Sequence, residues 1–252
     1  MEELIAVCGL EWRKFNWSIM SEDLRLPLVY AWKIYILATI FEHGRLIAVC
    51  GLEWRKFNWS IMSEDLRLPL VYAWKIYILA EIYSEYDTFT WMDSAIVLNN
   101  GSPLNSIFDG MENSTISEVV FPGSADPPHG VQFATNVRTY NFIPLVSNLI
   151  KIENKWDERM IAAGFNIMHK SEYTRQLLKW ALLCAATKQC INPEGSKLAC
   201  PGASSTPSCH RFDQSVFALL TINSEYQRYV LDNGETDYIN LVRVTFSKKL
   251  KV

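Results

Sequence analysis

Residues 70–93 read "LVYAWKIYILAEIYSEYDTFTWMD" and contain a helix pattern followed at once by a strand pattern. In the first part, apolar residues recur at helical spacing directly after Pro69, a residue that suits the first turn of a helix. The following run, Thr88–Met92, is rich in aromatic and β-branched residues, which is typical of a buried strand. The sequence therefore predicts a helix, a short connection and a strand that stops at Asp93.

The segment that leads into this helix occurs twice. Leu4–Ala38 and Leu46–Ala80 are identical over 35 residues and lie 42 positions apart. Repeats that stack into solenoids recur three or more times and diverge, because only the residues at the contact between repeats are constrained. Two perfect copies indicate instead a recent duplication, or a gene model that joined two versions of one exon. The second copy runs directly into the strand that ends at Asp93, so we expect the second copy in the core. We expect the first copy to form a similar helix outside the core or only loosely against it.

Length and charge limit the possible domains and partners. The chain has 252 residues, of which 49% are hydrophobic and 20% charged, enough for one α/β domain with an appendage. We divide it into residues 1–45, the first copy with its linker, and residues 46–252, the domain. The net charge of -3 argues against a nucleic-acid-binding protein, which needs a basic excess.

The sequence predicts no transmembrane segment in this chain. The most membrane-like stretch, Leu26–Phe41, has 16 residues with Lys33 in its middle, whereas a span needs about 20 apolar residues. The start, "MEELIAVCGLEW", carries acidic residues where a signal peptide is basic. We therefore expect a buried helix in the apolar stretch and an incomplete N-terminus.

The cysteines indicate disulfide bonds. Four of the six lie around a loop rich in Gly, Pro and Ser, namely Cys184, Cys190, Cys200 and Cys209. Their spacing lacks the C-x-x-C pairs typical of zinc sites, so we expect at least one disulfide among them, which requires an oxidising compartment. Glycosylation triplets agree with the secretory pathway, either the Golgi lumen or the extracellular space. They begin at Asn16, Asn58, Asn100 and Asn113.

The rest of the chain alternates strand patterns with helix patterns, which is typical of an α/β layer with a mainly parallel sheet. Ser171 and Asp213 are the expected N-caps of two helices, and Asn99–Gly130 is expected to be a polar connection. The expected strands are 46–52, 131–136, 164–170 and 238–246, and the expected helices are 171–188 and 213–222.

In a parallel sheet, ligands bind beyond the carboxyl ends of the strands. Asp93 would lie at such an end, where its carboxylate suits a divalent cation or a ribose hydroxyl, because hard cations prefer oxygen ligands. The alternative is an Asp that caps a turn. The sequence has no G-x-S-x-G, H-E-x-x-H or Gly-rich phosphate loop. His210 beside Cys209 suggests a thiol–imidazole dyad, but adjacent side chains rarely point at one another, and we expect a stapled loop there.

Several segments together resemble an uncharacterised, expanded invertebrate family of domains of unknown function. They are "WRKFNWS", "VYAWKIYILAEIYSEYDTFTWMDSAI", "FATN", "AGFNIMHKSEYTRQLLKWALLCA" and "CHRFDQSVFALL". That family is similar in turn to the GT-A glycosyltransferases. The resemblance spans about residues 50–220 and implies a GT-A-like nucleotide-diphospho-sugar transferase fold. It also implies transfer of a sugar from a nucleotide-sugar donor to a glycan or protein acceptor.

The resemblance further implies roles for individual residues. Asp93 would orient the diphosphate, alone or with Mn²⁺ as the metal it holds. Gly164 and Asn166 would lie along the donor sugar. Asp213 and Gln214 would face the sugar from the start of their helix, and Asp213 would be the catalytic base if the reaction inverts the anomeric centre.

Two features depart from the family pattern. GT-A enzymes that use manganese usually carry D-x-D, whereas the sequence here is "DSA", with Ala95 in place of the second carboxylate. The region that would hold the nucleotide base is occupied by the first copy and its linker. The alternative hypothesis is therefore a catalytically inactive fragment, or a carbohydrate-binding or interaction module.

Overall fold

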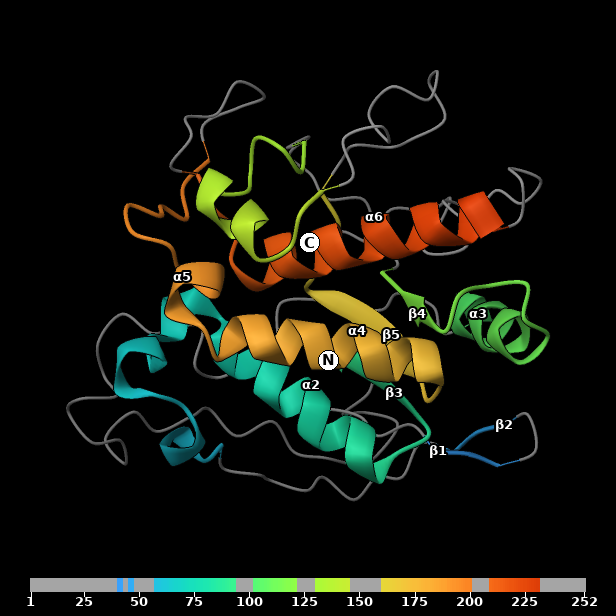
Figure 1. The fold of residues 1–252 in the computed structure, drawn as a ribbon. Helices are drawn as coiled ribbons and strands as arrows, with labels where there is room; N and C mark the ends of the chain where they lie inside the picture. The colour runs from blue at the N-terminus through green and yellow to red at the C-terminus, as the bar shows by residue number, and fades with distance from the viewer. Residues whose placement is uncertain are drawn as a thin grey trace.

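The computed structural model describes residues 40–42, 45–47, 57–93, 102–121, 130–145, 160–200 and 209–231. At its centre is a three-stranded sheet in the order β3–β5–β4, with both pairs antiparallel (Figure 1). The strands are β3 (Thr88–Met92), β4 (Val119–Val120) and β5 (Phe165–His169).

The fold is thus mixed α/β, but the expected mainly parallel sheet is wrong for the described residues. Alternating helix and strand patterns do not reveal which strands are neighbours. Here β5 pairs with both β3 and β4, so the two parallel strands β3 and β4 are separated by an antiparallel one.

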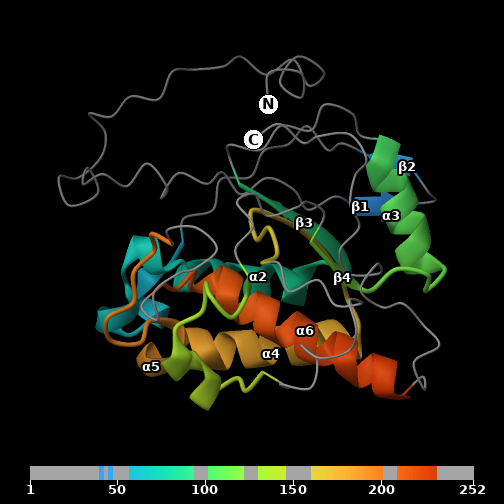
Figure 2. The same ribbon diagram turned by 90° about the horizontal axis from the view of Figure 1, so that it is seen from above.

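Four helices cover the two faces of this sheet. The helices α2 (Ala73–Glu85), α4 (Glu172–Ala185) and α6 (Asp213–Leu231) lie together on one side, and α3 (Ser102–Glu112) lies on the other (Figure 2). The short helix α5 (Lys188–Ile191) follows α4. Each face of the sheet therefore has its own apolar core.

The two cores differ in size. The larger one joins β3 to α2, α4 and α6 and includes Trp74, Ile76, Leu79, Phe89, Leu177 and Phe217. The smaller one lies under α3 and contains Leu104, Ile107, Met111, Val120, Phe165 and Ile167. Along β5, Phe165 and Ile167 face α3, so the alternate residue Asn166 faces the larger core.

Most helix starts follow from local sequence. A 3-10 turn at Pro69–Val71 leads into α2. Ser171 caps α4 as expected, because its side chain accepts a hydrogen bond of 3.1 Å from the backbone N–H of Thr174. The helix α6 begins at Asp213 itself, so Asp213 is its first helical residue and not, as the sequence had predicted, its N-cap.

Some expected elements differ from the structure. Residues 131–136 form turns, not a strand, and the 3-10 helix η6 (Val137–Asn141) follows. Asn136 begins that helix, since its side chain accepts a hydrogen bond from the N–H of Arg138 at 3.0 Å. The expected polar connection contains α3 and β4. The expected strand at 238–246 lies outside the described residues.

A short antiparallel hairpin precedes the domain core. The strands β1 (Ile40–Glu42) and β2 (Arg45–Ile47) pair with Ile40 opposite Ile47. The sequence pattern indicated a helix that continues beyond Thr39, which is wrong because residues 40–42 form the strand β1. The strand β2 covers only the first two residues of the expected strand 46–52.

The second copy of the duplicated segment packs into the larger core. Its first two residues lie in β2, and it is described again from residue 57 onward. The buried apolar residues there are Met62, Leu66, Val71, Ala73, Trp74, Ile76, Ile78 and Leu79. The first copy, Leu4–Ala38, lies outside the described residues. Its expected place outside the core therefore stays a prediction.

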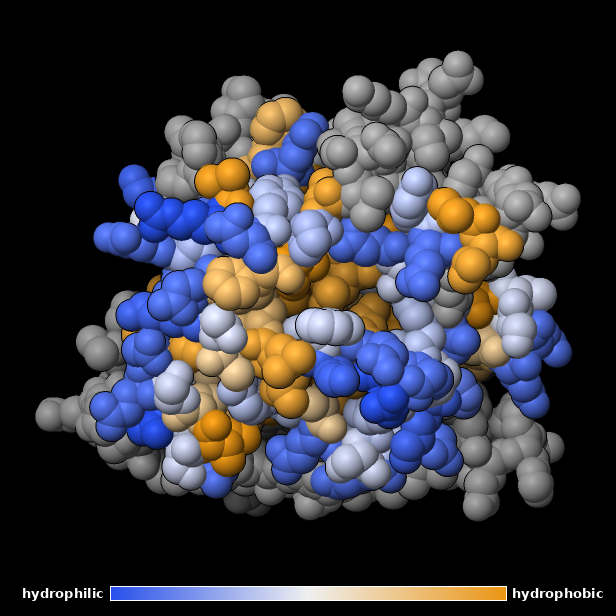
Figure 3. Space-filling model, in the orientation of Figure 1, coloured by the Kyte–Doolittle hydropathy of each residue, from blue (hydrophilic) through white to orange (hydrophobic). Residues whose placement is uncertain are grey.

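The surface around α4 and α6 is polar with apolar atoms visible between the two helices (Figure 3). The outer side of α4 carries an ion pair between Arg175 and Glu172, with N and O 2.6 Å apart, and exposes Trp180 and Leu183. Within the described ranges, no helix is long and apolar enough to cross a membrane.

Candidate functional site

Lys75 is the most unusual residue of the larger core. It lies in the first turn of α2 and is only 2% exposed, between the buried residues Trp74 and Ile76. Burying an ammonium group is costly unless opposite charges and hydrogen-bond acceptors surround it. Its surroundings therefore identify the polar centre of the domain.

Two carboxylates and a carbonyl surround the Lys75 ammonium. The Nζ atom lies 3.4 Å from Oδ2 of Asp213 and 3.8 Å from Oδ1 of Asp93. It also donates a hydrogen bond to the carbonyl oxygen of Ala163 and lies 5.0 Å from the centre of the Trp91 ring. We call Lys75, Asp93 and Asp213 the Lys75 cluster. With all three groups ionised, its net charge is −1.

Asp93 is placed by the end of β3. Its backbone N–H donates to the carbonyl of Gly164 at 2.7 Å, which continues the β3–β5 pairing by one residue. Its Oδ1 accepts a hydrogen bond of 2.9 Å from Nε1 of Trp91. The side chain is 22% exposed, so Asp93 is the member of the cluster that reaches solvent.

Asp213 is placed by the start of α6 and is 5% exposed. The residue before it, Phe212, has a φ of 49°, and the residue before α2, Tyr72, has a φ of 56°. A left-handed conformation is strained for a large side chain and persists only where surrounding contacts hold it. Thus both helices that supply the Lys75 cluster begin directly after a strained residue.

The segment Ile161–Gly164 connects the parts of this site. Its carbonyl groups accept hydrogen bonds from three elements: Ile161 from the side chain of Gln214 at 2.5 Å, Ala163 from Lys75, and Gly164 from the backbone of Asp93. Gln214 also accepts a hydrogen bond from Nε of Arg211 at 3.2 Å. Its amide is therefore engaged by the protein at both ends.

Asn166 adds a buried amide without a partner. It is 0% exposed, and neither its Oδ1 nor its Nδ2 has a hydrogen-bond partner among the described residues. It pairs directly with Trp91 across β3 and β5, and directly paired residues share one face of a sheet. Buried polar atoms are rarely left unpaired in native proteins, so this amide calls for an explanation.

The structure brings two of the five predicted site residues, Asp93 and Asp213, next to the Lys75 ammonium. Gly164 accepts a hydrogen bond from the backbone of Asp93, and Asn166 pairs with Trp91, whose ring lies beside Lys75. The fifth, Gln214, bonds to the same connecting segment. The sequence analysis missed Lys75 itself. A signal was present, because Lys75 is a single lysine in an otherwise apolar helix pattern. The equivalent residue of the first copy, Lys33, was used only as an argument against a membrane span.

The residues around Asp93 do not fit a manganese site between the two carboxylates. A hard divalent cation needs several oxygen ligands within roughly 2 to 2.6 Å. The Lys75 ammonium lies between Asp93 and Asp213, and a second cation beside it would be repelled. No group of three His, Cys, Asp or Glu side chains could hold a metal ion in the part of the chain that the structure describes. Ala95 lies outside that part.

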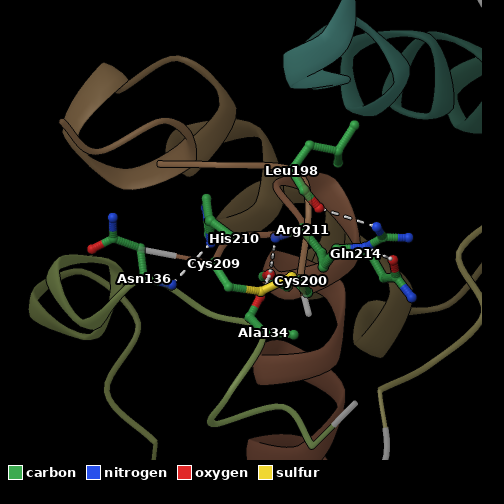
Figure 4. Close-up of a disulfide and its surroundings, with 9 residues drawn as sticks. Ala134, Asn136, Leu198, Cys200, Cys209, His210, Arg211 and Gln214 are labelled. Atoms are coloured by element: carbon green, nitrogen blue, oxygen red, sulfur yellow. Dashed lines mark hydrogen bonds between the residues drawn. A yellow bond between two sulfur atoms is a disulfide. The ribbon is translucent and has the colours of Figure 1, made fainter. Parts of the chain in front are cut away.

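A second polar cluster lies just before Asp213, in the motif "CHRFDQS". His210 is 0% exposed, its Nδ1 accepts from the N–H of Asn136 at 3.1 Å, and its Nε2 donates to the carbonyl of Ile191 at 3.0 Å (Figure 4). Burial lowers the pKa of His210 to about 4, so the ring is neutral at pH 7. His210 therefore joins three segments of backbone.

The cysteines near His210 form disulfides, as expected. Cys184 pairs with Cys190, and Cys200 pairs with Cys209. Cys209 is consequently not a thiol, and the dyad with His210 is excluded. Beside the second disulfide, Arg211 donates from its guanidinium to the carbonyl of Leu198 at 3.2 Å, as Figure 4 shows. These bonds fix the loop that leads into α6.

Comparison with known proteins identified no similar protein. No family model, no curated protein and no solved structure matches the chain.

Proposed function

We propose that this protein binds a nucleotide sugar at the Lys75 cluster and transfers the sugar to a glycan or protein acceptor. The observation that supports this best is the convergence of Asp93, Asp213, Gly164 and Asn166. The family resemblance implies roles for these residues, and they come from three separate segments. Asp93 and Asp213 pair with one buried ammonium, Gly164 bonds to Asp93, and Asn166 pairs with Trp91 across the sheet.

The chemistry of the cluster suits a sugar. Ionised carboxylates accept hydrogen bonds from hydroxyl groups, and an asparagine amide both donates and accepts. The amide of Asn166, which has no described partner, would be satisfied by a ligand hydroxyl. Lys75 offsets one of the two negative charges, which reduces the repulsion that a diphosphate would meet beside Asp93 and Asp213.

Within this proposal, the role of each residue follows from its exposure. Asp93 is the more exposed carboxylate and would meet the donor near its diphosphate. Asp213 is the buried one and would act on the sugar, as the catalytic base in an inverting reaction. Gln214 would act indirectly, because its amide holds the segment that carries Gly164.

A competing function is a non-catalytic carbohydrate-binding or interaction module. One observation favours it: Lys75 and Asp213 are almost fully buried and satisfy each other, so the cluster can stabilise the fold without any ligand. The two functions differ in turnover. Release of nucleoside diphosphate from a donor supports the transferase, whereas sugar binding without release supports the module.

We further propose a location in the secretory pathway, in the Golgi lumen or outside the cell. Two disulfides support this, because they persist in oxidising compartments. The glycosylation triplets at Asn58 and Asn113 lie on exposed turns, where a glycan would be accommodated.

The test of the proposed function is calorimetric titration of the full chain with a panel of UDP- and GDP-sugars. We expect heat from at least one donor. The Asp93→Ala substitution should weaken binding of that donor by about tenfold or more, because a charge-assisted hydrogen bond to the donor is lost. Asp213→Ala should weaken binding less and mainly lower turnover.

The matched control is Asp87→Ala, which removes an 87% exposed carboxylate one residue before β3. The Asp87→Ala variant should bind the donor with the same affinity as the original chain. No heat with any donor, or equal losses in the Asp93 and Asp87 variants, would contradict the proposed function.

A further inference from the structure

The Lys75 ammonium lies where oxygen atoms from three segments of the chain meet. An ammonium group has three hydrogen-bond donors, and Nζ of Lys75 faces three oxygen atoms. They belong to the carbonyl of Ala163 and to the carboxylates of Asp213 and Asp93. A hard cation between two carboxylates and a carbonyl would use the same kind of oxygen atoms.

We propose that Lys75 is the resident cation of this site, and that the site binds its ligand without a divalent metal. The identity of the ligand rests on the proposed function, but the competition between Lys75 and a metal does not. The proposal explains why a second carboxylate is not needed at Ala95, where a D-x-D motif would have it. The positive charge is built into the chain.

The position of Lys75 is fixed more firmly than that of an exposed lysine. Its side chain is 2% exposed and begins on the first turn of a helix whose buried residues pack into the larger core. The indole of Trp91 lies beside the ammonium and also donates to Asp93. Removing the ammonium would take a positive charge away from the 7% exposed side chain of Asp213 and from Asp93.

Asn166 provides an independent indication that a ligand enters beside Lys75. Its amide is fully buried, has no partner among the described residues and shares a sheet face with Trp91. An amide both donates and accepts hydrogen bonds, so it is a good partner for a hydroxyl. The unpaired group therefore fits a polyhydroxy ligand that binds beside a fixed ammonium.

The rival arrangement is a metal ion carried in by the ligand. Magnesium-like ions are often held by one or two carboxylates together with substrate phosphates. Such an ion would bind on the exposed side of Asp93, away from Lys75. The experiment must therefore examine the protein alone and the protein with its donor.

The first measurement is Mn²⁺ binding to the full chain, in which electron paramagnetic resonance measures the concentration of free Mn²⁺. We expect no Mn²⁺ binding that depends on Asp93 in the original chain. Lys75→Ala should gain such a site, because removing the ammonium frees the space beside two carboxylates for a metal ion, and Lys75→Arg should not gain it. The control Lys179→Ala removes an exposed lysine from α4 and should behave like the original chain.

Three results would overturn the proposal. The first is Mn²⁺ bound by the original chain and lost in Asp93→Asn. The second is a folded Lys75→Ala variant that gains no Mn²⁺ site. The third comes from titrating the donor in the presence of a chelator and again in the presence of Mn²⁺. If the donor affinity is at least tenfold lower with the chelator, the ligand carries a metal ion into the site.

The two proposals fail separately. If no donor binds under either condition, the proposed function fails, and the Mn²⁺ measurements still decide the role of Lys75. If Lys75→Ala does not fold, the Mn²⁺ measurement and the donor titration on the original chain decide it. Equal donor affinity with and without metal is the expected result.

Discussion

Two buried polar clusters lie only three residues apart at the start of α6, and they differ in how their polar atoms are satisfied. His210 is neutral, fully buried and bonded to backbone groups through both ring nitrogens. Asp213 is charged, paired with Lys75 at 3.4 Å, and lies in a site that includes the unpaired amide of Asn166. One cluster is complete, and the other is not.

The difference separates structural from functional roles. A buried polar group that has all its hydrogen bonds stabilises one conformation and gains nothing from a ligand. A buried amide without a hydrogen-bond partner costs stability, and such a group is expected where a ligand completes it. On this criterion the motif "CHRFDQS" divides in two: Cys209 to Arg211 hold the loop, and Asp213 belongs to the proposed ligand site.

The largest effect is expected from Lys75→Ala. Removing one partner of a buried ion pair leaves an uncompensated charge and costs roughly 3 to 5 kcal/mol, with the lower value expected here because Asp93 is 22% exposed. Urea unfolding of this variant beside the exposed control Lys179→Ala measures it. A difference below about 1 kcal/mol between the two variants would show that the cluster does not need the ammonium.

The second effect concerns pH and His210. The pKa of this ring is about 4 in the folded chain, against an ordinary value of 6.5, so the unfolded chain binds the proton more readily. Stability is therefore complete above pH 6.5 and falls as the pH drops toward 4, by about 3 kcal/mol in all.

Unfolding free energies measured at several pH values test this, with His210→Gln as the reference that lacks the titrating ring. The difference between the two chains should shrink as the pH falls from 6.5 to 4. If that difference stays constant, the ring is not held neutral by the fold.

The third effect concerns the disulfide next to His210. Replacing Cys200 and Cys209 together by serine should lower stability by about 2 to 3 kcal/mol, because the bond closes a loop with a sequence separation of 9 and limits the unfolded chain. The matched pair is Cys184 and Cys190, with a separation of 6, for which a slightly smaller loss is expected. Mass mapping that finds free thiols at these positions in secreted protein would contradict the pairing.

The sequence predicted the elements whose signals are local. The helix and strand of residues 73–92, β5 and the Ser171 cap follow from periodicity, β-branched and aromatic residues, and a capping serine. α3 was missed because polar residues surround its buried apolar residues, Leu104, Ile107 and Met111. The sheet direction was wrong because pairing joins segments far apart in the chain.

The sequence analysis named several residues of the candidate site. Asp93 was recognised by its place after a strand, and Asp213 and Asn166 entered through the family resemblance. Lys75 was missed, since nothing in a single sequence shows that a lysine in an apolar helix faces two carboxylates from other segments. The roles of all these residues stay predictions.

The smallest effect on stability, and the sharpest test of the comparison, is expected from Asn166→Val. The amide has no described partner, so removing it abolishes no hydrogen bond, and valine suits a buried strand. We expect a change within about 0.5 kcal/mol, or a gain. The control is Asn136→Ala, since Asn136 is also buried but bonds to the N–H of Arg138 and to Ser196, and its loss should cost about 1 to 2 kcal/mol. Donor titration should show the reverse order, with binding weakened in the Asn166 variant and unchanged in the Asn136 variant. A large loss of stability in Asn166→Val would mean that this amide is satisfied within the protein, and it would remove the main difference between the two clusters.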